Sequence, residues 1–376
     1  GAALAYLDAL QEAMLEANCI VLNSAISTAG KCRHWEAALE LLCDSLVMSL
    51  AAGVIAYNAA VSGAEKGGRW QRSLDLLRGV RAQGLRPDAI TYNAAISAAE
   101  KGLQWQRALA LLGEMRKESI LPDVITYSAA ISASEKGRQW VRALALFREM
   151  KLDEVLPDLI VYNSVIIACA KGQQWERALA LIEEMIKGGI PPDVVTFSSG
   201  VSACQLGQQW AAALALVDRM RARGIHPDCI TCNALISSCE TGQLWQLALQ
   251  IPEDMRSMRM SPDVVAYSSA VSACGRVSQW ARALCLLMDM QEYGVQPNIV
   301  TFNAAITACD KCERWAEALA VLREMERARC APDGITYNAA MSACRKARRW
   351  RGVLALLASQ RAGRLAPDPQ GWAEAA

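Results

Sequence analysis

A chain of 376 residues in which 53% are hydrophobic carries too many apolar side chains for a disordered polar segment. Its 39 Lys and Arg balance 38 Asp and Glu, so the net charge of +1 gives no bulk indication of nucleic-acid binding. With only two His, His34 and His226, a His-rich metal site or a His-based acid–base enzyme is not expected. The 14 Cys are spread along the chain and predict reduced thiols in an intracellular, reducing compartment. The sequence contains no run of about 18 apolar residues, so no membrane span is predicted.

One period runs through the whole sequence. Ten Trp residues follow one another in steps of 35: Trp35, Trp70, Trp105, Trp140, Trp175, Trp210, Trp245, Trp280, Trp315 and Trp350. A Pro-Asp pair keeps the same step from Pro87-Asp88 to Pro367-Asp368, with Pro297-Asn298 as its variant. Such a period indicates a repeat protein. We predict ten tandem 35-residue units over residues 19–368, the second half of a truncated unit over 1–18, and a short C-terminal tail over 369–376.

Each unit is predicted to form two helices, as residues 89–123 illustrate. Apolar residues spaced 0, 3, 4 and 7 predict the first helix: Tyr92, Ala95, Ile96 and Ala99. Gly102 interrupts, and a second helix is predicted by Trp105, Ala108, Leu109, Leu112 and Met115. Pro122 ends the unit, and Asp123 can cap the next helix. The predicted fold class is all-α, a solenoid of helix-turn-helix repeats whose apolar faces, Trp included, are buried by stacking.

The other face of the first helix repeats a set of side chains. With the Asp numbered 35 in each unit, this face carries positions 2, 5, 9 and 13. Position 2 is β-branched: Ile20, Ile55, Ile90, Ile125, Ile160, Val195, Ile230, Val265, Val300 and Ile335. Position 5 is Asn or Ser: Asn23, Asn58, Asn93, Ser128, Asn163, Ser198, Asn233, Ser268, Asn303 and Asn338. Position 13 is basic in eight units: Lys31, Lys66, Lys101, Lys136, Lys171, Arg276, Lys311 and Lys346.

This combination favours a single-stranded nucleic acid as the ligand. An Asn amide can hydrogen-bond a base edge, a stiff apolar side chain can lie against a base, and a cation can meet a phosphate. Three alternatives remain open from the residues alone. Position 2 can pack between neighbouring units, the position-13 cation can complement a helix C-terminus, and the position-35 Asp can serve only as a helix cap.

The motif Ile-Thr-Tyr-Asn-Ala-Ala-Ile-Ser-Ala at 90–98, continuing through Trp105 and Ala108-Leu109 to Pro122-Asp123, resembles the pentatricopeptide repeat family. The resemblance covers about nine-tenths of the chain, and the uniform unit length is similar to the P class of that family. Tetratricopeptide repeats run 34 residues with a different signature.

The resemblance implies a right-handed superhelix that binds single-stranded RNA, one nucleotide per repeat, in organellar RNA processing, stability, editing or translation in a mitochondrion or chloroplast. It implies that position 2 sandwiches bases, position 13 approaches phosphate, and positions 5 and 35 together select the base. The position-35 residues are Asp88, Asp123, Asp158, Asp193, Asp228, Asp263, Asn298, Asp333 and Asp368, with Gly53 in the first unit. Asn with Asp implies uridine, Ser268 with Asn298 implies adenine, and Ser with Asp is less usual. The implied site is U-rich, N-U-U-G-U-G-U-A-U-U, with the two guanines the weakest assignments.

Enzymatic functions fit the sequence less well. The pairs Cys229/Cys232 and Cys309/Cys312 lie 80 residues apart, more than two units, whereas solenoid units contact only their neighbours. We therefore expect no metal, no cofactor and no catalysis. The alternative function is a protein-interaction scaffold like the tetratricopeptide repeats, and a third possibility is a fragment of a longer enzyme. Protein partners in RNA processing are compatible with the family, and no membrane partner is expected.

Overall fold

The computed structural model describes residues 19–31, 35–47 and 53–362, and side chains within 24–30, 35–42 and 53–360. All regular secondary structure in these ranges is α-helical. Over the same ranges, no helix combines the length and hydropathy needed to cross a bilayer. The chain divides into two compact units that meet in sequence between Pro192 and Asp193.

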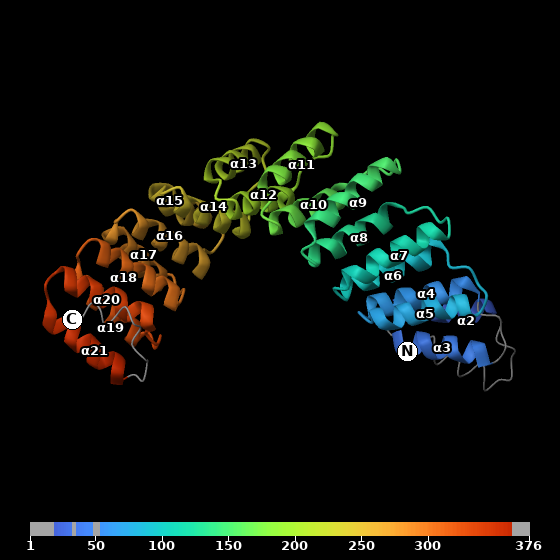
Figure 1. Ribbon diagram of the computed structural model, residues 1–376, viewed down its shortest axis with the longest axis horizontal. Coiled ribbons are helices and arrows are strands. Elements are labelled where there is room, and N and C mark those ends of the chain that lie inside the picture. The colour runs from blue at the N-terminus through green and yellow to red at the C-terminus, as the bar shows by residue number, and fades with distance from the viewer. Residues whose placement is uncertain (1–18, 32–34, 48–52, 363–376) are drawn as a thin grey trace. The chain divides into compact units, whose positions relative to one another are not determined.

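The helices of each unit follow one another in chain order as pairs (Figure 1). Unit 1 contains α2 (Cys19–Lys31), α3 (Trp35–Val47), α4 (Val54–Lys66), α5 (Trp70–Ala82), α6 (Ala89–Lys101), α7 (Trp105–Lys117), α8 (Val124–Lys136), α9 (Trp140–Leu152), α10 (Leu159–Lys171) and α11 (Trp175–Lys187). Unit 2 contains α12 (Val194–Leu206), α13 (Trp210–Ala222), α14 (Cys229–Thr241), α15 (Trp245–Ser257), α16 (Val264–Arg276), α17 (Trp280–Glu292), α18 (Ile299–Lys311), α19 (Trp315–Arg327), α20 (Gly334–Lys346) and α21 (Trp350–Ala362).

The position-35 residue starts the next first helix. Asp88 has extended backbone, and its carboxylate accepts a hydrogen bond from the Thr91 amide at 2.9 Å. The Thr91 hydroxyl in turn accepts from the Asp88 amide, which completes a capping box. Asn298 caps α18 in the same way, through Oδ1 and the Thr301 amide at 2.9 Å. The predicted capping role of position 35 is therefore confirmed.

The turn between the two helices of a repeat differs from our expectation. Gly102, which we expected to break the chain, has an ordinary φ of −79°. The left-handed residue is the next one, Leu103, with φ of 56°. Gly102 is instead needed for space, because a Cβ there would lie 2.3 Å from Cδ1 of Trp70 in the preceding repeat.

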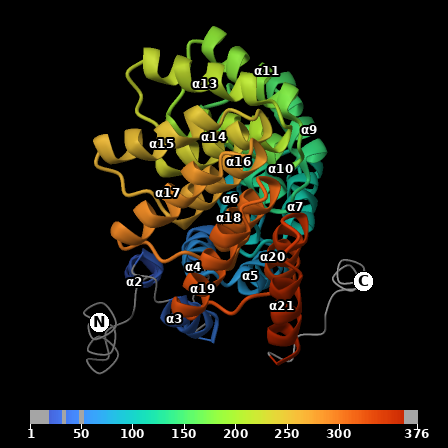
Figure 2. The ribbon, with the colours of Figure 1, turned by 90° about the vertical axis from the view of Figure 1, so that its left-hand side faces the viewer.

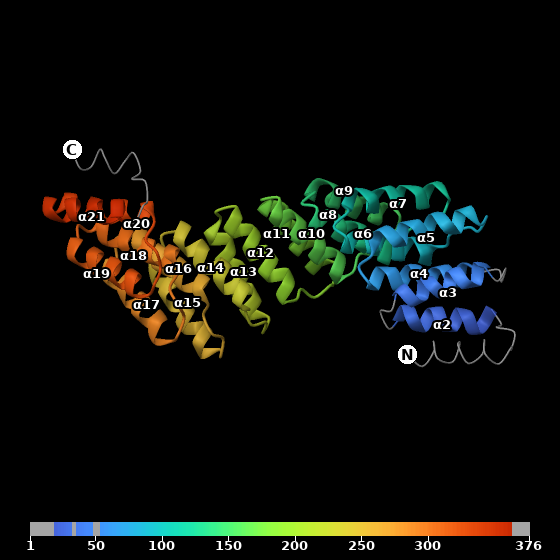
Figure 3. The same cartoon turned by 90° about the horizontal axis from the view of Figure 1, so that it is seen from below.

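The first helices form one continuous layer in each unit. In unit 1, α4 packs against α6 and α6 against α8, while each second helix packs against its own partner and the next first helix. Figure 2 shows α13, α15 and α17 along one side of unit 2, beside α14, α16 and α18, and Figure 3 shows the pairs from below. Small side chains allow the first helices to approach closely, as with the fully buried Ala95, Ala98 and Ala99 of α6.

The core follows the predicted first-helix pattern but excludes the Trp residues. Tyr92, Ala95, Ile96 and Ala99 are all fully buried, as predicted. In α7, Ala108, Leu112 and Met115 are buried as predicted. Leu109 is only partly buried, and Leu111, which we had not predicted, is buried instead.

The prediction that the Trp residues lie in the core is wrong. They stand at the first residue of each second helix, and none is buried: Trp210 is 39% and Trp350 52% exposed, and the others are partly covered. An Arg of the following repeat covers several of these rings, for example Arg142 at 5.3 Å from the Trp105 centroid. The Trp residues therefore join successive repeats at the surface.

Candidate nucleic-acid interface

The position-2 side chains lie on the surface of the first-helix layer. From Ile55 to Ile335, each is between 46% and 70% exposed. β-Branched apolar side chains are seldom left in water at every repeat of a packed array. The alternative that they pack between neighbouring units is therefore wrong, and they are free to contact a ligand.

Position 5 is tied to position 35 by hydrogen bonds. The Asn93 amide nitrogen donates to both carboxylate oxygens of Asp123, at 3.1 and 3.0 Å. The Thr126 hydroxyl, at position 3 of the following repeat, donates to the Asn93 Oδ1. Asn93, Asp123 and Thr126 thus form a hydrogen-bonded triad that joins two repeats, and the capping Asp also contacts the position-5 amide.

The same triad recurs, with informative exceptions. Asn58 with Asp88 and Thr91, and Asn303 with Asp333 and Thr336, repeat all its contacts. Asn233 donates to Asp263 at 3.0 Å, but the following position 3 is Ala266, and the buried Asn233 Oδ1 has no partner.

The Ser variants of position 5 behave differently from Asn. Ser268 Oγ donates to the carbonyl oxygens of Val264 and Val265 on its own helix, at 2.7 and 3.1 Å. Ser198 donates to the Val195 carbonyl at 3.1 Å. Ser198, Ser268 and also Asn163 are less than 10% exposed, so in these repeats position 5 is buried. The Asn side chains of the other described repeats are partly exposed.

The triads lower the pKa of two carboxylates, Asp88 and Asp333. Partial burial alone would raise the pKa of Asp88, but hydrogen bonds from the Thr91 amide and hydroxyl and from Asn58 outweigh it, and the pKa is lowered. The pKa of Asp333 is lowered by the same balance, with Thr336 and Asn303 as donors. These carboxylates are therefore charged, acceptor-only groups at neutral pH.

Six of the position-13 cations have partners within the protein: Lys101, Lys136, Lys171, Arg276, Lys311 and Lys346. Lys101 Nζ lies 2.8 Å from Glu65 Oε1, and Lys136 Nζ lies 2.9 Å from Glu100 Oε1. The carboxylate in each case is position 12 of the preceding repeat. The alternative of a helix C-terminus contact describes Lys311, whose Nζ donates to the Gly275 carbonyl at 3.1 Å. Their role in phosphate binding remains a prediction.

Four predicted site residues lie outside the described part of the chain. They are the side chains of Ile20, Asn23 and Lys31 in the first repeat, and Asp368 in the last. Sequence reasoning also missed two positions, the Thr at position 3 and the acid at position 12. Both recur with the 35-residue period, so the repeat alignment itself held the signal.

The Cys side chains at position 11 are packing residues. Cys169, Cys204, Cys239 and Cys274, all at position 11, are buried, and burial raises the pKa of each thiol to about 11. In the described ranges, no three His, Cys, Asp or Glu gather as metal ligands.

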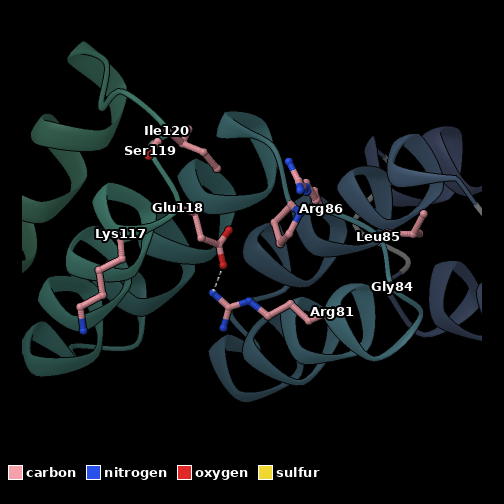
Figure 4. Close-up of a pocket in the computed structure, with 9 residues that line it drawn as sticks. Arg81, Gly84, Leu85, Arg86, Lys117, Glu118, Ser119 and Ile120 are labelled. Atoms are coloured by element: carbon pink, nitrogen blue, oxygen red, sulfur yellow. Dashed lines mark ion pairs between the residues drawn. The ribbon is translucent and has the colours of Figure 1, made fainter.

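A surface groove of about 650 Å³ lies at the C-terminal ends of α5 and α7 and the loops that follow them. Arg81, Arg86, Lys117 and Glu118 contribute to its lining (Figure 4). Arg81 is neutralised by Glu118 and Glu114, each at 2.9 Å. No position-2, -5, -13 or -35 side chain lines this groove, although its lining residue Pro87 directly precedes Asp88.

Comparison with known proteins identifies the family. Three pentatricopeptide repeat models match: the pentatricopeptide repeat domain at residues 215–277 and 285–347, the PPR repeat family at 87–136 and 157–205, and the PPR repeat at 125–155 and 265–295. The comparison with curated proteins returned no relative.

Solved structures show the same fold. The crystal structure of the pentatricopeptide repeat protein PPR10 in complex with an 18-nt psaJ RNA element matches with a TM-score of 0.64 at 20% identity, covering 96% of this chain and 57% of that one. PPR10 from maize matches with a TM-score of 0.53 at 22% identity, covering 99% and 62%. The chain thus spans under two-thirds of the length of these structures. Together with the repeat matches and the helix-pair stack, these findings place the chain in the pentatricopeptide repeat family.

Proposed function

We propose that this chain binds single-stranded RNA in a sequence-selective manner, one nucleotide per repeat. The observation that carries the proposal is the triad of position 5, position 35 and the following position 3, lying beside an exposed position-2 side chain. The family match and the RNA in the PPR10 complex support it.

The triad leaves part of each Asn amide available to a base. An Asn side chain has two N–H donors and two acceptor lone pairs. In Asn93 the nitrogen contacts Asp123 and the oxygen accepts from Thr126, which leaves a second lone pair and, at most, one N–H. A base resting on Ile90 or Ile125 would find a fixed hydrogen-bonding edge. Stacking contributes about 1–3 kcal/mol per base in single-strand binders.

The proposal includes a U-rich site, N-U-U-G-U-G-U-A-U-U, read from the position-5 and position-35 pairs. It also includes P-class architecture, no catalytic step, and an organellar role in RNA processing, stability, editing or translation. The last rests on family membership alone. A peptide-binding scaffold is the weaker candidate, because a peptide groove gives no reason to repeat Asn with Asp.

A gel-shift titration tests the proposal directly. The probes are the decamer UUUGUGUAUU, a scrambled decamer of the same composition, and the decamer paired to its complement. We expect the first to bind at least tenfold more tightly than the other two. Equal affinity for all three would contradict sequence selection, and no binding to any of them would contradict the function.

A further inference from the structure

Five ion pairs link successive first helices. Each joins a position-12 carboxylate to the position-13 cation of the next repeat: Glu65–Lys101, Glu100–Lys136, Glu135–Lys171, Glu240–Arg276 and Asp310–Lys346. We call this series the acid–base ladder. It lies on the face that carries positions 5, 9 and 13.

The carboxylates of the ladder are held more firmly than the cations. Glu65 Oε1 accepts from the Ser97 hydroxyl at 2.8 Å as well as from Lys101, and the Glu100 and Glu240 carboxylates are shared in the same way with Ser132 and Ser272. The Glu65 side chain is 17% exposed and the Lys101 side chain 44%. The acid is therefore fixed inside the face, and the cation lies over it.

The sequence pairs acid with base along the chain. Wherever position 12 of a repeat is an acid, position 13 of the next repeat is a cation. Where position 12 is Ala170 or Gln205, the next position 13 is uncharged, Leu206 or Thr241. The exceptions are Lys66 and Lys311. In the repeat before each of them, position 12 is a Gly, namely Gly30 and Gly275.

These two cations have no carboxylate partner in the described part of the chain. Lys311 donates to the neutral Gly275 carbonyl, and no ion pair involves the exposed Lys66. Neither glycine can be replaced freely by an acid, because a Cβ at Gly30 would lie 2.8 Å from the Ala59 carbonyl oxygen, and one at Gly275 would lie 3.3 Å from that of Ala304.

We propose that the acid–base ladder withholds its five cations from the RNA backbone, so that phosphate contacts are strongest at Lys66 and Lys311. A phosphate that approaches Lys101 also meets the Glu65 carboxylate beside it, and opposite charges at 2.8 Å largely cancel at the distance of the phosphate. The position-12 residue is then a determinant of affinity and salt dependence. This inference rests on the proposed function.

The main test removes the acids without removing their hydrogen-bonding capacity. Glu65→Gln, Glu100→Gln, Glu135→Gln and Glu240→Gln are combined. At three of these sites Gln can still accept from the position-9 hydroxyl, of Ser97, Ser132 or Ser272, whereas position 9 of the repeat after Glu135 is Ile167, which has no such donor. The control combines Glu176→Gln, Asp218→Asn, Glu253→Gln and Glu292→Gln, which are exposed second-helix acids with the same change in net charge. Binding of labelled UUUGUGUAUU is measured between 0.05 and 0.4 M KCl.

We expect the ladder variant to bind at least tenfold more tightly than the control at 0.1 M salt. Its plot of log affinity against log salt should steepen by about 0.7 for each freed cation. Equal slopes for the two variants would overturn the inference, as would weaker binding by the ladder variant, since the acids would then position the cations for RNA. Failure of the unaltered protein to bind RNA would instead contradict the proposed function.

A second comparison does not depend on the fourfold variant folding. Lys66→Gln removes an unpaired cation, and Glu65→Gln with Lys101→Gln removes a paired one in the next repeat. We expect Lys66→Gln to lower the slope by about 0.7 and to weaken binding about fivefold at 0.1 M salt. The double variant, Glu65→Gln with Lys101→Gln, should lose less than half as much affinity and slope. A loss equal to that of Lys66→Gln would contradict the inference.

Discussion

At Asn93, hydrogen bonds from two repeats fix an amide that would otherwise be free to turn over. The acceptor-only Asp123 carboxylate takes the nitrogen side, and the Thr126 hydroxyl takes the oxygen side. A reversed amide would place two acceptors against each other at Asp123. If this repeat binds RNA as proposed, the hydrogen-bonding edge offered to the base is therefore set by three residues, one of which belongs to the following helix.

Replacing Thr126 by Val should weaken both the fold and the selectivity at this repeat. Val keeps the shape of the fully buried Thr side chain, but it leaves Asn93 Oδ1 without its donor. We expect a loss of about 1–3 kcal/mol in the free energy of unfolding. In competition binding, discrimination between U and A at the matching nucleotide should fall.

The chain contains its own control for Thr126→Val. Ala266→Thr would supply the missing donor to Asn233 Oδ1, which lacks a partner. It should raise stability and sharpen selection at the Asn233 repeat. If neither substitution changes selectivity while both change stability, the Thr is only structural.

Exchanging the selecting pair should change the preferred base at one position. Asn93→Ser with Asp123→Asn copies the Ser268 and Asn298 pair, and Asn298 shows that Asn still caps the helix. We expect preference at the nucleotide matching this repeat to shift from U to A, measured with decamers that differ only there. An unchanged preference for U would refute the pairing rule for this chain.

Sequence could predict positions 2, 5 and 35 because each is visible within one repeat. It did not reveal that Thr126 reaches Asn93, or that Glu65 reaches Lys101, because those residues are 33 and 36 positions apart and meet only when repeats stack. The prediction that the Trp residues lie in the core was wrong for a related reason. Their spacing placed them in phase with the apolar face, but they stand at the first residue of the helix, where the packed layer ends.

At the scale of the element, the short turn of each helix pair stores backbone strain. A left-handed residue recurs one position after the Gly, and it is Leu103 in one repeat, Arg138 in the next and Gly68 in another. A side chain at positive φ costs roughly 1 kcal/mol relative to Gly. Gly102 does not relieve this strain, since its own φ is negative.

Two substitutions in this turn should therefore act in opposite directions. Leu103→Gly should raise the free energy of unfolding by about 1 kcal/mol, because Gly adopts the left-handed conformation freely. Gly102→Ala should lower it by about 1–3 kcal/mol, because the new methyl group meets the Trp70 ring. Urea denaturation followed by circular dichroism measures both.

Gly113→Ala is the matched control for Gly102→Ala. Gly113 lies within α7, and no heavy atom lies within 4 Å of a Cβ built there. Ala should therefore raise stability by up to about 1 kcal/mol through helix propensity. If Gly102→Ala is also stabilising, the Trp ring moves aside and the Gly is not needed for space.

The helices themselves were the most predictable feature. Amphipathic spacing is local, and all four residues that it predicted for the buried face of α6 are buried, although Thr91, Ala94 and Ala98 are buried as well. The turn was less predictable because Gly usually marks positive φ, and here the requirement for space next to Trp places Gly one residue earlier.

At the scale of the whole molecule, the packing position 11 supplies a series of buried Cys thiols. Position 11 is Cys in consecutive repeats of unit 2, at Cys204, Cys239, Cys274, Cys309 and Cys344, and all five are buried against neighbouring helices. Burial raises the pKa of each of these thiols, to about 12 for Cys309. The native stack therefore binds these protons more tightly than the unfolded chain does.

Buried and exposed thiols should separate cleanly in an alkylation experiment. At pH 8.5 a thiol with a pKa of about 11, such as Cys204 or Cys239, is ionised in roughly one molecule in 300, and it is also covered by its neighbours. We expect iodoacetamide to modify the exposed Cys229 and Cys285 within minutes and to spare the position-11 thiols, as read by mass spectrometry. Rapid labelling of Cys239 in the folded protein would show that the stack opens readily.

The same thiols predict how stability responds to alkaline pH. Their folded pKa lies above the unfolded value of about 8.5, so their contribution to stability is fully present below that pH and is lost as pH rises toward 11. The melting temperature should fall steadily over this range. Replacing Cys204, Cys239 and Cys274 by Ala, the residue at position 11 in several other repeats, should flatten the decline, because three of the ionising groups are gone. An equal decline in that variant would assign the effect to other groups, such as Tyr162, whose pKa is also raised.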